Sequence, residues 1–341
     1  MSNNSIQVTF LELIKNKIDA NTNLVDDLAE KLNVSRDSAY RRLRGETPLT
    51  FDEIGILGNA YEISIDQLLN IDSTQVTFYN RNISNEDLDF TEYNKSVLTN
   101  LTTLNQFKLK ELIFTSRDLP PFHYYQFPEL TKFKMFFWQK SIVNNPEFRK
   151  QKYVGDLISK ELMGITTSIW EKYMIIPSKE IWSDETINKT LWQLDYYFEA
   201  GFVKKNIAIK ILEEFREMVL HIKAEAAQGK KYFYKRPDTG IENSFELYYN
   251  EISSNENTIF FIMDDVKVVY ITYNALNTLH TTDKEFCEKI YKHVTNVVQK
   301  GTLISSTSEK LRNKIFGKME NRIKNLMDKL IEEKDPNKES L

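Results

Sequence analysis

The chain has 341 residues, of which 41% are hydrophobic and 28% are charged, and its formal net charge is −4. This is about twice the length of a typical domain, so we expect two or three domains, and the composition excludes an intrinsically disordered chain. The negative net charge excludes an overall attraction for nucleic acid, so any affinity for DNA must come from a local basic patch.

Glycine and cysteine are both scarce. None of the 10 glycines forms a G-x-G pair, which disfavours a glycine loop for phosphate binding. The single cysteine, Cys287, excludes an internal disulfide and suits a reducing compartment. The N-terminal sequence lacks the basic and apolar regions of a signal peptide, and no window approaches the roughly 18 apolar residues of a membrane span. We therefore expect a cytoplasmic protein without contact to a membrane.

The first helices are predicted from apolar spacing and from capping residues. Residues 8–18 have the period of an amphipathic helix, and leucines at every fourth position of 24–32, after Asn21 as N-cap, predict a second helix. Ser35 is a good N-cap for a third helix, which ends before Gly45, a residue suited to the left-handed position after a helix. The second and third helices meet at a three-residue turn, which predicts a helix-turn-helix.

The third helix carries four arginines within nine residues. Guanidinium groups bind guanine edges in a bidentate manner and also neutralise phosphates, so such a helix suits the major groove of DNA. We predict that Ala39 and Leu43 point inward. The residues expected to face outward are Arg36, Asp37, Tyr40, Arg41 and Arg44.

Two further short helices are predicted after Gly45. The sequence TFDE at 50–53 is a capping box before an apolar stripe, and SIDQ at 64–67 repeats the device. The first 71 residues are therefore predicted to form an all-α, five-helix domain.

Residues at fixed spacing in this domain match a known family. They are Ala29 in the first helix of the pair, Val34 and Ser35 at the turn, Gly45 after the second helix, and ISIDQL at 63–68. With them the chain resembles the lambda-repressor-like (phage-repressor) helix-turn-helix superfamily, in the form found in transcription regulators of Bacteroidetes bacteria. The resemblance covers mainly residues 8–70.

The resemblance implies a role for each exposed residue of the recognition helix on double-stranded DNA. It implies base contacts for Ser35, Arg36, Asp37, Tyr40 and Arg41, and a phosphate contact for Arg44. The chain departs from the family pattern at Arg42, which stands where the last position of this helix is usually apolar. The segments 118–122 and 127–138 also resemble the domain that follows the DNA-binding domain in these regulators, but the resemblance implies no ligand.

A different function remains open for the same helices. Residues 1–71 carry seven Lys and Arg against eleven Asp and Glu, which is unfavourable for nonspecific DNA binding. An arginine-rich helix is also often only a solvated face. The alternative is a protein-interaction module, such as an anti-repressor or scaffold, that uses the helix-turn-helix for protein contacts.

Residues 72–90 are polar and are predicted to form a linker, and a segment rich in aromatic residues follows. In residues 122–138, nine of seventeen positions are aromatic or histidine, and a helix is expected to begin near Pro128. Such density is typical of a large core or of the wall of a hydrophobic pocket. We hypothesise that the segment contributes to a ligand pocket. The candidate residues are Phe122, His123, Tyr124, the residue at position 134 and Trp138.

Residues 91–335 are predicted to form a mostly helical sensor and oligomerisation region, followed by a polar tail at 336–341. A short strand is predicted at 111–115, and runs at 245–252, 258–263 and 266–273 predict a three-stranded antiparallel meander at about 245–273. Helices are predicted at 92–105, 154–174, 184–200, 203–228, 283–300 and 307–332. The apolar stripe of the last helix indicates packing on the sheet or a dimer seam, and packing is favoured because Gly317 weakens a coiled coil.

The predicted fold class is therefore multidomain α+β, with a small antiparallel sheet in the C-terminal region. We expect no enzyme, no cofactor and no metal, because the sequence has no phosphate loop or nucleophile elbow and its four histidines lack metal-ligand spacing. The predicted function is that of a sequence-specific DNA-binding transcription regulator. It is expected to act as a homodimer, with a C-terminal domain that senses a small molecule or a protein partner.

Overall fold

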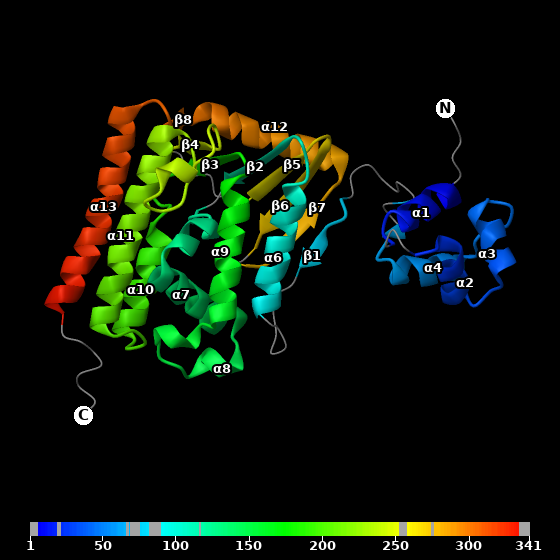
Figure 1. The fold of residues 1–341 in the computed structure, drawn as a ribbon, viewed down its shortest axis with the longest axis horizontal. Helices are drawn as coiled ribbons and strands as arrows, with labels where there is room; N and C mark the ends of the chain where they lie inside the picture. Colours follow the sequence, from blue (N-terminus) through cyan, green and yellow to red (C-terminus); the bar gives the residue numbers. More distant parts are fainter. Residues whose placement is uncertain are drawn as a thin grey trace. The chain divides into compact units, whose positions relative to one another are not determined.

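A computed structural model describes residues 6–18, 22–65, 68, 76–81, 90–115, 117–251, 258–273 and 276–333. The chain divides into two compact units, Met1–Thr77 and Phe78–Leu341, and each is described by itself (Figure 1). Among the described residues, no helix has both the length and the apolar character needed to cross a membrane.

The described part of the N-terminal unit is helical. Its helices are α1 (Ile6–Lys15), α2 (Leu24–Leu32), α3 (Arg36–Leu43) and α4 (Phe51–Ala60). The capping box predicted at the start of α4 is confirmed, whereas α2 is capped by Asn23. Asn21, the predicted cap, lies outside the described residues, as does most of the predicted fifth helix.

The predicted linker at 72–90 contains regular structure where it is described. Residues 79–81 form strand β1, which pairs with a strand near residue 280, and helix α6 already begins at Phe90. The remainder of this linker, residues 72–75 and 82–89, lies outside the described residues. The polar composition of this segment therefore gave no indication of the short edge strand β1.

The C-terminal unit is built on one mixed sheet whose described strands number eight, in the order β1-β7-β6-β5-β2-β3-β4-β8. Strands β2, β3 and β4 run parallel to one another, and all other neighbours are antiparallel. The strands are β1 (Tyr79–Arg81), β2 (Lys110–Thr115), β3 (Ser178–Trp182), β4 (Phe245–Tyr249), β5 (Thr258–Met263), β6 (Val266–Thr272), β7 (Thr278–Thr281) and β8 (Thr302–Leu303).

The prediction of a three-stranded antiparallel meander at about 245–273 is wrong, because β4 does not belong to it. Strand β4 pairs in parallel with β3 on the far side of β2, and the antiparallel meander consists of β5, β6 and β7. Only the β5–β6 pair was constrained by the sequence, because Asp264 and Asp265 form the two-residue turn between them and Asp264 has a φ of 50°. The composition of β4 predicted a strand but could not specify its partner.

Strand β3 was not predicted at all. Two of its five residues, Lys179 and Glu180, are charged, so the sequence lacks the apolar pattern that is typical of a strand. The strand still lies in the middle of the sheet. Glu180 is nevertheless fully buried.

Helices cover both faces of the sheet (Figure 1). The helices of this unit are α6 (Phe90–Leu104), α7 (Pro128–Phe137), α8 (Pro146–Arg149), α9 (Lys160–Met174), α10 (Asn188–Glu199), α11 (Lys205–Gln228), α12 (Lys284–Lys300) and α13 (Glu309–Glu332). In β2, Ile113 packs in one cluster with Cys287 of α12, whereas Leu112 and Phe114 pack with the other helices on the opposite face.

The helices predicted at 92–105, 203–228, 283–300 and 307–332 are confirmed to within two residues at each end. Helix α9 begins later than predicted, because the Ser159 side chain accepts a hydrogen bond from the Leu162 amide and caps it there. The apolar stripe of α13 is buried inside the unit, where α13 packs against α11. This confirms packing rather than a dimer seam, although the partner is a helix.

Gly229 ends α11 in the left-handed conformation, with a φ of 68°. A Cβ atom at this position would overlap Ser306 Oγ. We expect Gly229→Ala to lower the free energy of unfolding of the C-terminal unit by more than about 1 kcal/mol, measured by urea denaturation of the full chain. The matched control is Gly317→Ala, which lies in α13 with open space around it and should raise this free energy by about 0.5–1 kcal/mol. Equal free energies for the two variants would contradict the prediction.

Candidate nucleic-acid interface and ligand cavity

The turn between α2 and α3 is held by local hydrogen bonds. Asn33 has a left-handed φ of 51°, and the Val34 amide donates to the Ala29 carbonyl at 3.0 Å. The Ser35 side chain accepts from the Ser38 amide at 3.2 Å, so the predicted N-cap is confirmed. These caps end one helix and begin the next within three residues, which fixes the path of the chain at the turn.

The predicted inner and outer faces of α3 are both observed. Ala39 is fully buried, and Leu43 is half-buried against the core of the unit. The side chains of Arg36, Arg41 and Arg44 are 69%, 61% and 58% exposed. All six predicted DNA-contacting residues are exposed, namely Ser35, Arg36, Asp37, Tyr40, Arg41 and Arg44.

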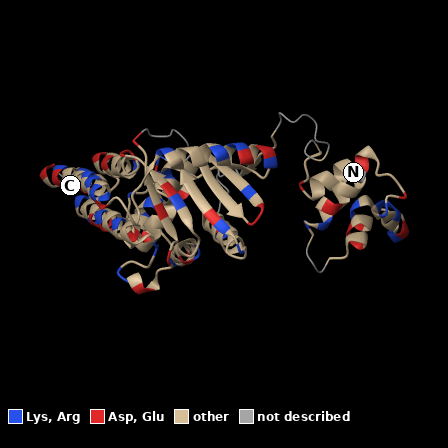
Figure 2. Cartoon of the chain, turned by 90° about the horizontal axis from the view of Figure 1, so that it is seen from above, with Lys and Arg blue, Asp and Glu red and all other residues tan. Residues whose placement is uncertain are grey.

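Each of the three exposed arginines has a carboxylate partner in the same unit, and Figure 2 shows acidic and basic positions side by side there. Arg36 Nε lies 3.0 Å from an Asp26 oxygen, and Arg41 Nε lies 3.3 Å from an Asp37 oxygen. Arg44 Nη1 lies 3.5 Å from a Glu46 oxygen. The basic face of α3 is thus partly neutralised.

Sequence reasoning missed these pairs, although one signal was present. Asp37 and Arg41 stand four residues apart in the same helix, which is the spacing of a helical ion pair. Asp26 pairs with Arg36 across two helices, and only the folded structure shows that contact.

Arg42 points into the unit and bridges α3 to α4. Its Nη2 donates to a Glu53 carboxylate oxygen at 2.7 Å, and its Nε lies 3.1 Å from both oxygens. The Arg42 and Glu53 side chains are only 14% and 13% exposed. A paired arginine thus occupies the position that is usually apolar in the resembled family.

Glu53 also completes the cap of α4, because its carboxylate accepts from the Thr50 amide at 2.9 Å. Burial alone would raise the pKa of Glu53, but the hydrogen bonds from Arg42 and Thr50 outweigh this effect and lower it. The carboxylate is therefore held in its charged form between the two helices.

We predict that Arg42→Met lowers the free energy of unfolding of the N-terminal unit by about 1–3 kcal/mol at neutral pH, because Glu53 loses its charged donor. A matched Arg41→Met variant removes an exposed pair and should change this free energy by less than about 0.5 kcal/mol. Because the pKa of Glu53 is lowered on folding, the contribution of the bridge is present above the ordinary glutamate pKa. It is lost as the pH falls through the lowered value. Urea denaturation at several pH values measures both effects, and equal losses for the two variants would refute the bridge.

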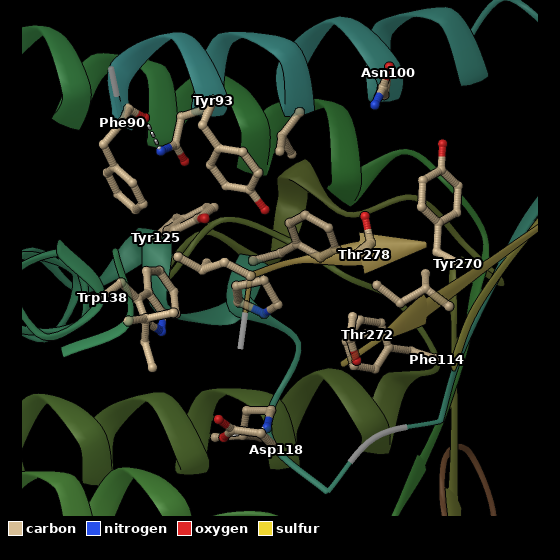
Figure 3. A pocket seen from close by; sticks show the side chains of 18 of the residues that line it. Phe90, Tyr93, Asn100, Phe114, Asp118, Tyr125, Trp138, Tyr270, Thr272 and Thr278 are labelled. Atoms are coloured by element: carbon tan, nitrogen blue, oxygen red, sulfur yellow. Dashed lines mark hydrogen bonds between the residues drawn. The ribbon is translucent and has the colours of Figure 1, made fainter. Parts of the chain in front are cut away.

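The C-terminal unit contains a cavity of about 460 Å³ (Figure 3). Its lining comes from α6, from β2 and the segment between β2 and α7, from the end of α7 and the π-helix that follows it (Trp138–Val143), from α10, and from β5, β6, β7 and the segment between β6 and β7. Ten of the 24 lining residues are aromatic, among them Tyr93, Tyr125 and Tyr270. The cavity has the size and the apolar character of small-molecule sites.

The structure brings only two of the five predicted pocket residues to the cavity wall, Phe122 and Trp138. His123 and Tyr124 are buried behind the wall, and position 134 is a lysine rather than an aromatic residue. Residues 121–126 form a 3-10 helix, in which side chains three apart share a face. Tyr125 therefore lines the cavity beside Phe122, and sequence reasoning missed it because the segment was given no helical period.

One end of the cavity is polar and contains Asp118, Lys189 and Gln193. Behind it, the fully buried Lys134 ammonium donates to Gln193 at 2.8 Å and to Thr190 at 3.2 Å. Burial lowers the pKa of Lys134, and Asp118, whose nearest carboxylate oxygen is 3.9 Å away, opposes that shift. Lys189 forms no ion pair with any other described residue.

The cavity wall contacts β1, the first strand after the division between the two units at residue 77. The Tyr270 ring lines the cavity and stacks on His280 with centroids 5.0 Å apart, and His280 stacks on Tyr79 of β1 at 5.3 Å. The Tyr273 hydroxyl, also at the cavity, donates to the Asn80 side chain at 3.3 Å. The cavity and the start of the C-terminal unit are thus joined by direct contacts.

A buried polar cluster lies outside the cavity lining. The Glu180 carboxylate accepts hydrogen bonds from Tyr173, from Trp182 Nε1 at 2.9 Å and from His123 Nε2 at 2.9 Å. Since a carboxylate only accepts, Nε2 of His123 carries the proton. Burial would raise the pKa of Glu180, but His123 and the other donors lower it.

Lys231 lies within the same cluster. Its ammonium donates to the Tyr173 and Ile176 carbonyls at 3.0 and 2.6 Å and to Ser178 Oγ at 2.9 Å. Burial lowers the pKa of Lys231 to about 7. None of these charged side chains lines the cavity, so we assign the cluster to the support of the fold.

The described residues offer little support for a metal site or a cysteine nucleophile. They contain no group of three His, Cys, Asp or Glu side chains that could hold a metal ion. Cys287 packs from α12 against the sheet, and burial raises the pKa of its thiol, which disfavours the thiolate form of a nucleophile.

No protein-family model, curated protein or solved structure matches the chain. The resemblance to the lambda-repressor-like superfamily therefore stays a prediction, and it rests on the residues quoted from 8–70.

Proposed function

We propose that the chain is a sequence-specific DNA-binding transcription regulator that acts as a homodimer. In this proposal the N-terminal unit binds DNA and the C-terminal unit receives an effector. The observation that carries it is the exposed face of α3, where Arg36, Arg41 and Arg44 follow a capped three-residue turn.

The proposed docking places α3 in the major groove of DNA. Ser35 and Arg36 stand at its N-terminal end, where main-chain amides and a guanidinium can meet bases and phosphates. Tyr40 and Arg41 lie one turn further on the same face. A dimer would place two such helices about 34 Å apart, on a palindromic or nearly palindromic site.

The ion pairs on α3 do not prevent this docking. Exposed ion pairs contribute only about 0–1 kcal/mol each, so a phosphate or a guanine edge can replace Asp26 or Asp37 as the arginine partner. The acidic residues nevertheless weaken nonspecific attraction to DNA. Affinity would depend on correct base contacts and on the dimer.

One observation favours the alternative, a protein-interaction module. Phe51, at the first position of α4, is 80% exposed, and Ile56 in the same helix is 47% exposed. Aromatic residues and arginines are both enriched at protein interfaces. The same helices could then bind a protein, as in an anti-repressor.

Selection of genomic DNA fragments with the purified full chain tests the proposal directly. We expect a palindromic motif from the wild-type protein and loss of that motif from an Arg36→Ala, Arg41→Ala double variant at the same moderate salt, because each bidentate base contact contributes about 1–3 kcal/mol. The control is Lys15→Ala, an exposed residue at the end of α1, which should retain the motif.

Each outcome decides between the two functions. If the folded wild-type protein enriches no sequence above background, the DNA-binding proposal fails and the protein-interaction module is favoured. A motif retained by the double variant would show that another surface reads the bases.

The pairing of Arg36 gives a second, independent prediction. Asp26→Asn removes a competing carboxylate from α2 and should tighten binding to the selected DNA about two- to fivefold, measured by fluorescence anisotropy. Glu12→Gln makes the same charge change on an exposed position of α1 and should have a smaller effect. Equal gains for both variants would show a general charge effect rather than release of Arg36.

A further inference from the structure

We infer that the cavity of the C-terminal unit binds a small carboxylate with an apolar body, and that Lys189 holds the carboxylate group. The inference rests on the proposed function in so far as it names the class of effector. The binding itself involves only the C-terminal unit, because every residue that lines the cavity belongs to it.

The size and the walls of the cavity define the apolar body. Protein interiors are close-packed, and a domain retains few voids larger than a water molecule. A cavity of about 460 Å³ among aromatic side chains is far larger than such voids and falls in the range of ligand sites. Walls that include Phe122, Tyr125 and Trp138 fit a flat ring system or an alkyl chain (Figure 3).

The charges at the polar end define the head group. Asp118 is the acidic residue of the lining, and its carboxylate already accepts from the Tyr124 hydroxyl at 3.3 Å and from the Leu119 amide at 2.9 Å, with the Lys134 ammonium 3.9 Å away. The charge of Lys134 offsets that of Asp118. Lys189 then remains as a cation at the wall without a carboxylate partner among the described residues.

Hydrogen-bonding capacity agrees with this charge distribution. Gln193 uses its carbonyl oxygen to accept from Lys134, so the amide group that it offers at the cavity wall is a donor. Lys189 and Gln193 both lie on α10, four residues apart, and therefore on one face of the helix. A carboxylate, which only accepts, is complementary to an ammonium and an amide donor.

The apolar body would extend from this head group toward the strands. Ile259, Phe261 and Tyr270 line the cavity from β5 and β6, and Tyr93 lines it from α6. A ligand in contact with Tyr270 would meet the stacked rings that lead through His280 to Tyr79 of β1. A bound ligand could thus change the position of β1, the strand that begins the C-terminal unit.

Calorimetric titration of the full chain, without DNA, tests the inference with two matched series of probes. The first is 2-naphthoate, its neutral primary amide and 2-naphthylmethylamine, and the second is dodecanoate, dodecanamide and dodecylamine. We expect the carboxylate of at least one series to bind about 10- to 100-fold more tightly than its amide, because a hydrogen bond to a charged group is gained.

Two variants locate the binding site. Lys189→Met keeps the length of the side chain and should reduce the affinity of the carboxylate to that of the amide, whereas Lys292→Met, at an exposed position on α12, should change neither affinity. Val97→Phe fills the cavity from α6 and should abolish binding of both compounds. Circular dichroism and the unfolding temperature confirm that each variant is folded.

Every outcome bears on the inference. Equal affinities for acid and amide, or retention of the preference by Lys189→Met, would overturn the assignment of Lys189. Tightest binding of the amine would assign the head group to Asp118 instead, and absence of binding in both series, or binding unaffected by Val97→Phe, would overturn the site. Because no DNA is present, these failures leave the DNA-binding proposal standing, and a failed DNA selection leaves carboxylate binding standing.

Discussion

A carboxylate in the middle of a sheet must be fully hydrogen-bonded or it destabilises the fold, and Glu180 of β3 meets this condition with side chains from separate elements. His123 comes from the 3-10 helix before α7, Tyr173 comes from α9, and Lys231 lies near the same carboxylate after α11. These segments are far apart in the sequence, so the cluster fixes their positions on one face of the sheet. Because His123 is held on that side, Phe122 and Tyr125 of the same 3-10 helix are directed to the cavity.

The two units obey different physical constraints. The C-terminal unit buries several charged side chains, among them Glu180 and Lys231, beside a large apolar core and a cavity. The N-terminal unit has a small apolar core, and the arginines of α3 and their partners lie mostly at its surface. Arg42 and Glu53 depart from this pattern, because both side chains are turned inward and paired with each other. Together with Ala39 and Leu43, which pack in the core, that bridge holds α3 with its other arginines on the surface.

Much of the secondary structure followed from the sequence, since caps and apolar periods are local signals. Ser35, Gly45 and Gly229 stand where the sequence placed helix ends, and the long helices near the C-terminus are confirmed. The partners of β4 and the existence of β3 could not be predicted, because strand order depends on contacts between distant residues. Two of the five candidate pocket residues line the cavity. The sequence showed no period for the 3-10 helix, and residues of α6, α10 and β5–β7 reach the cavity only in the folded chain, so no local pattern could identify them.

The position of β2 has a consequence for synthesis of the chain. Its neighbours are β3, which follows within about seventy residues, and β5, whose Thr258 lies opposite Thr115 at a separation of 143 residues. Until the ribosome has delivered residue 263, one edge of this apolar strand has no partner, and an unpaired edge of this kind is a site of aggregation. Chains that stop between β4 and β5 would therefore expose one edge of β2 in the middle of the sheet. The sheet can be completed only after β5 has been synthesised.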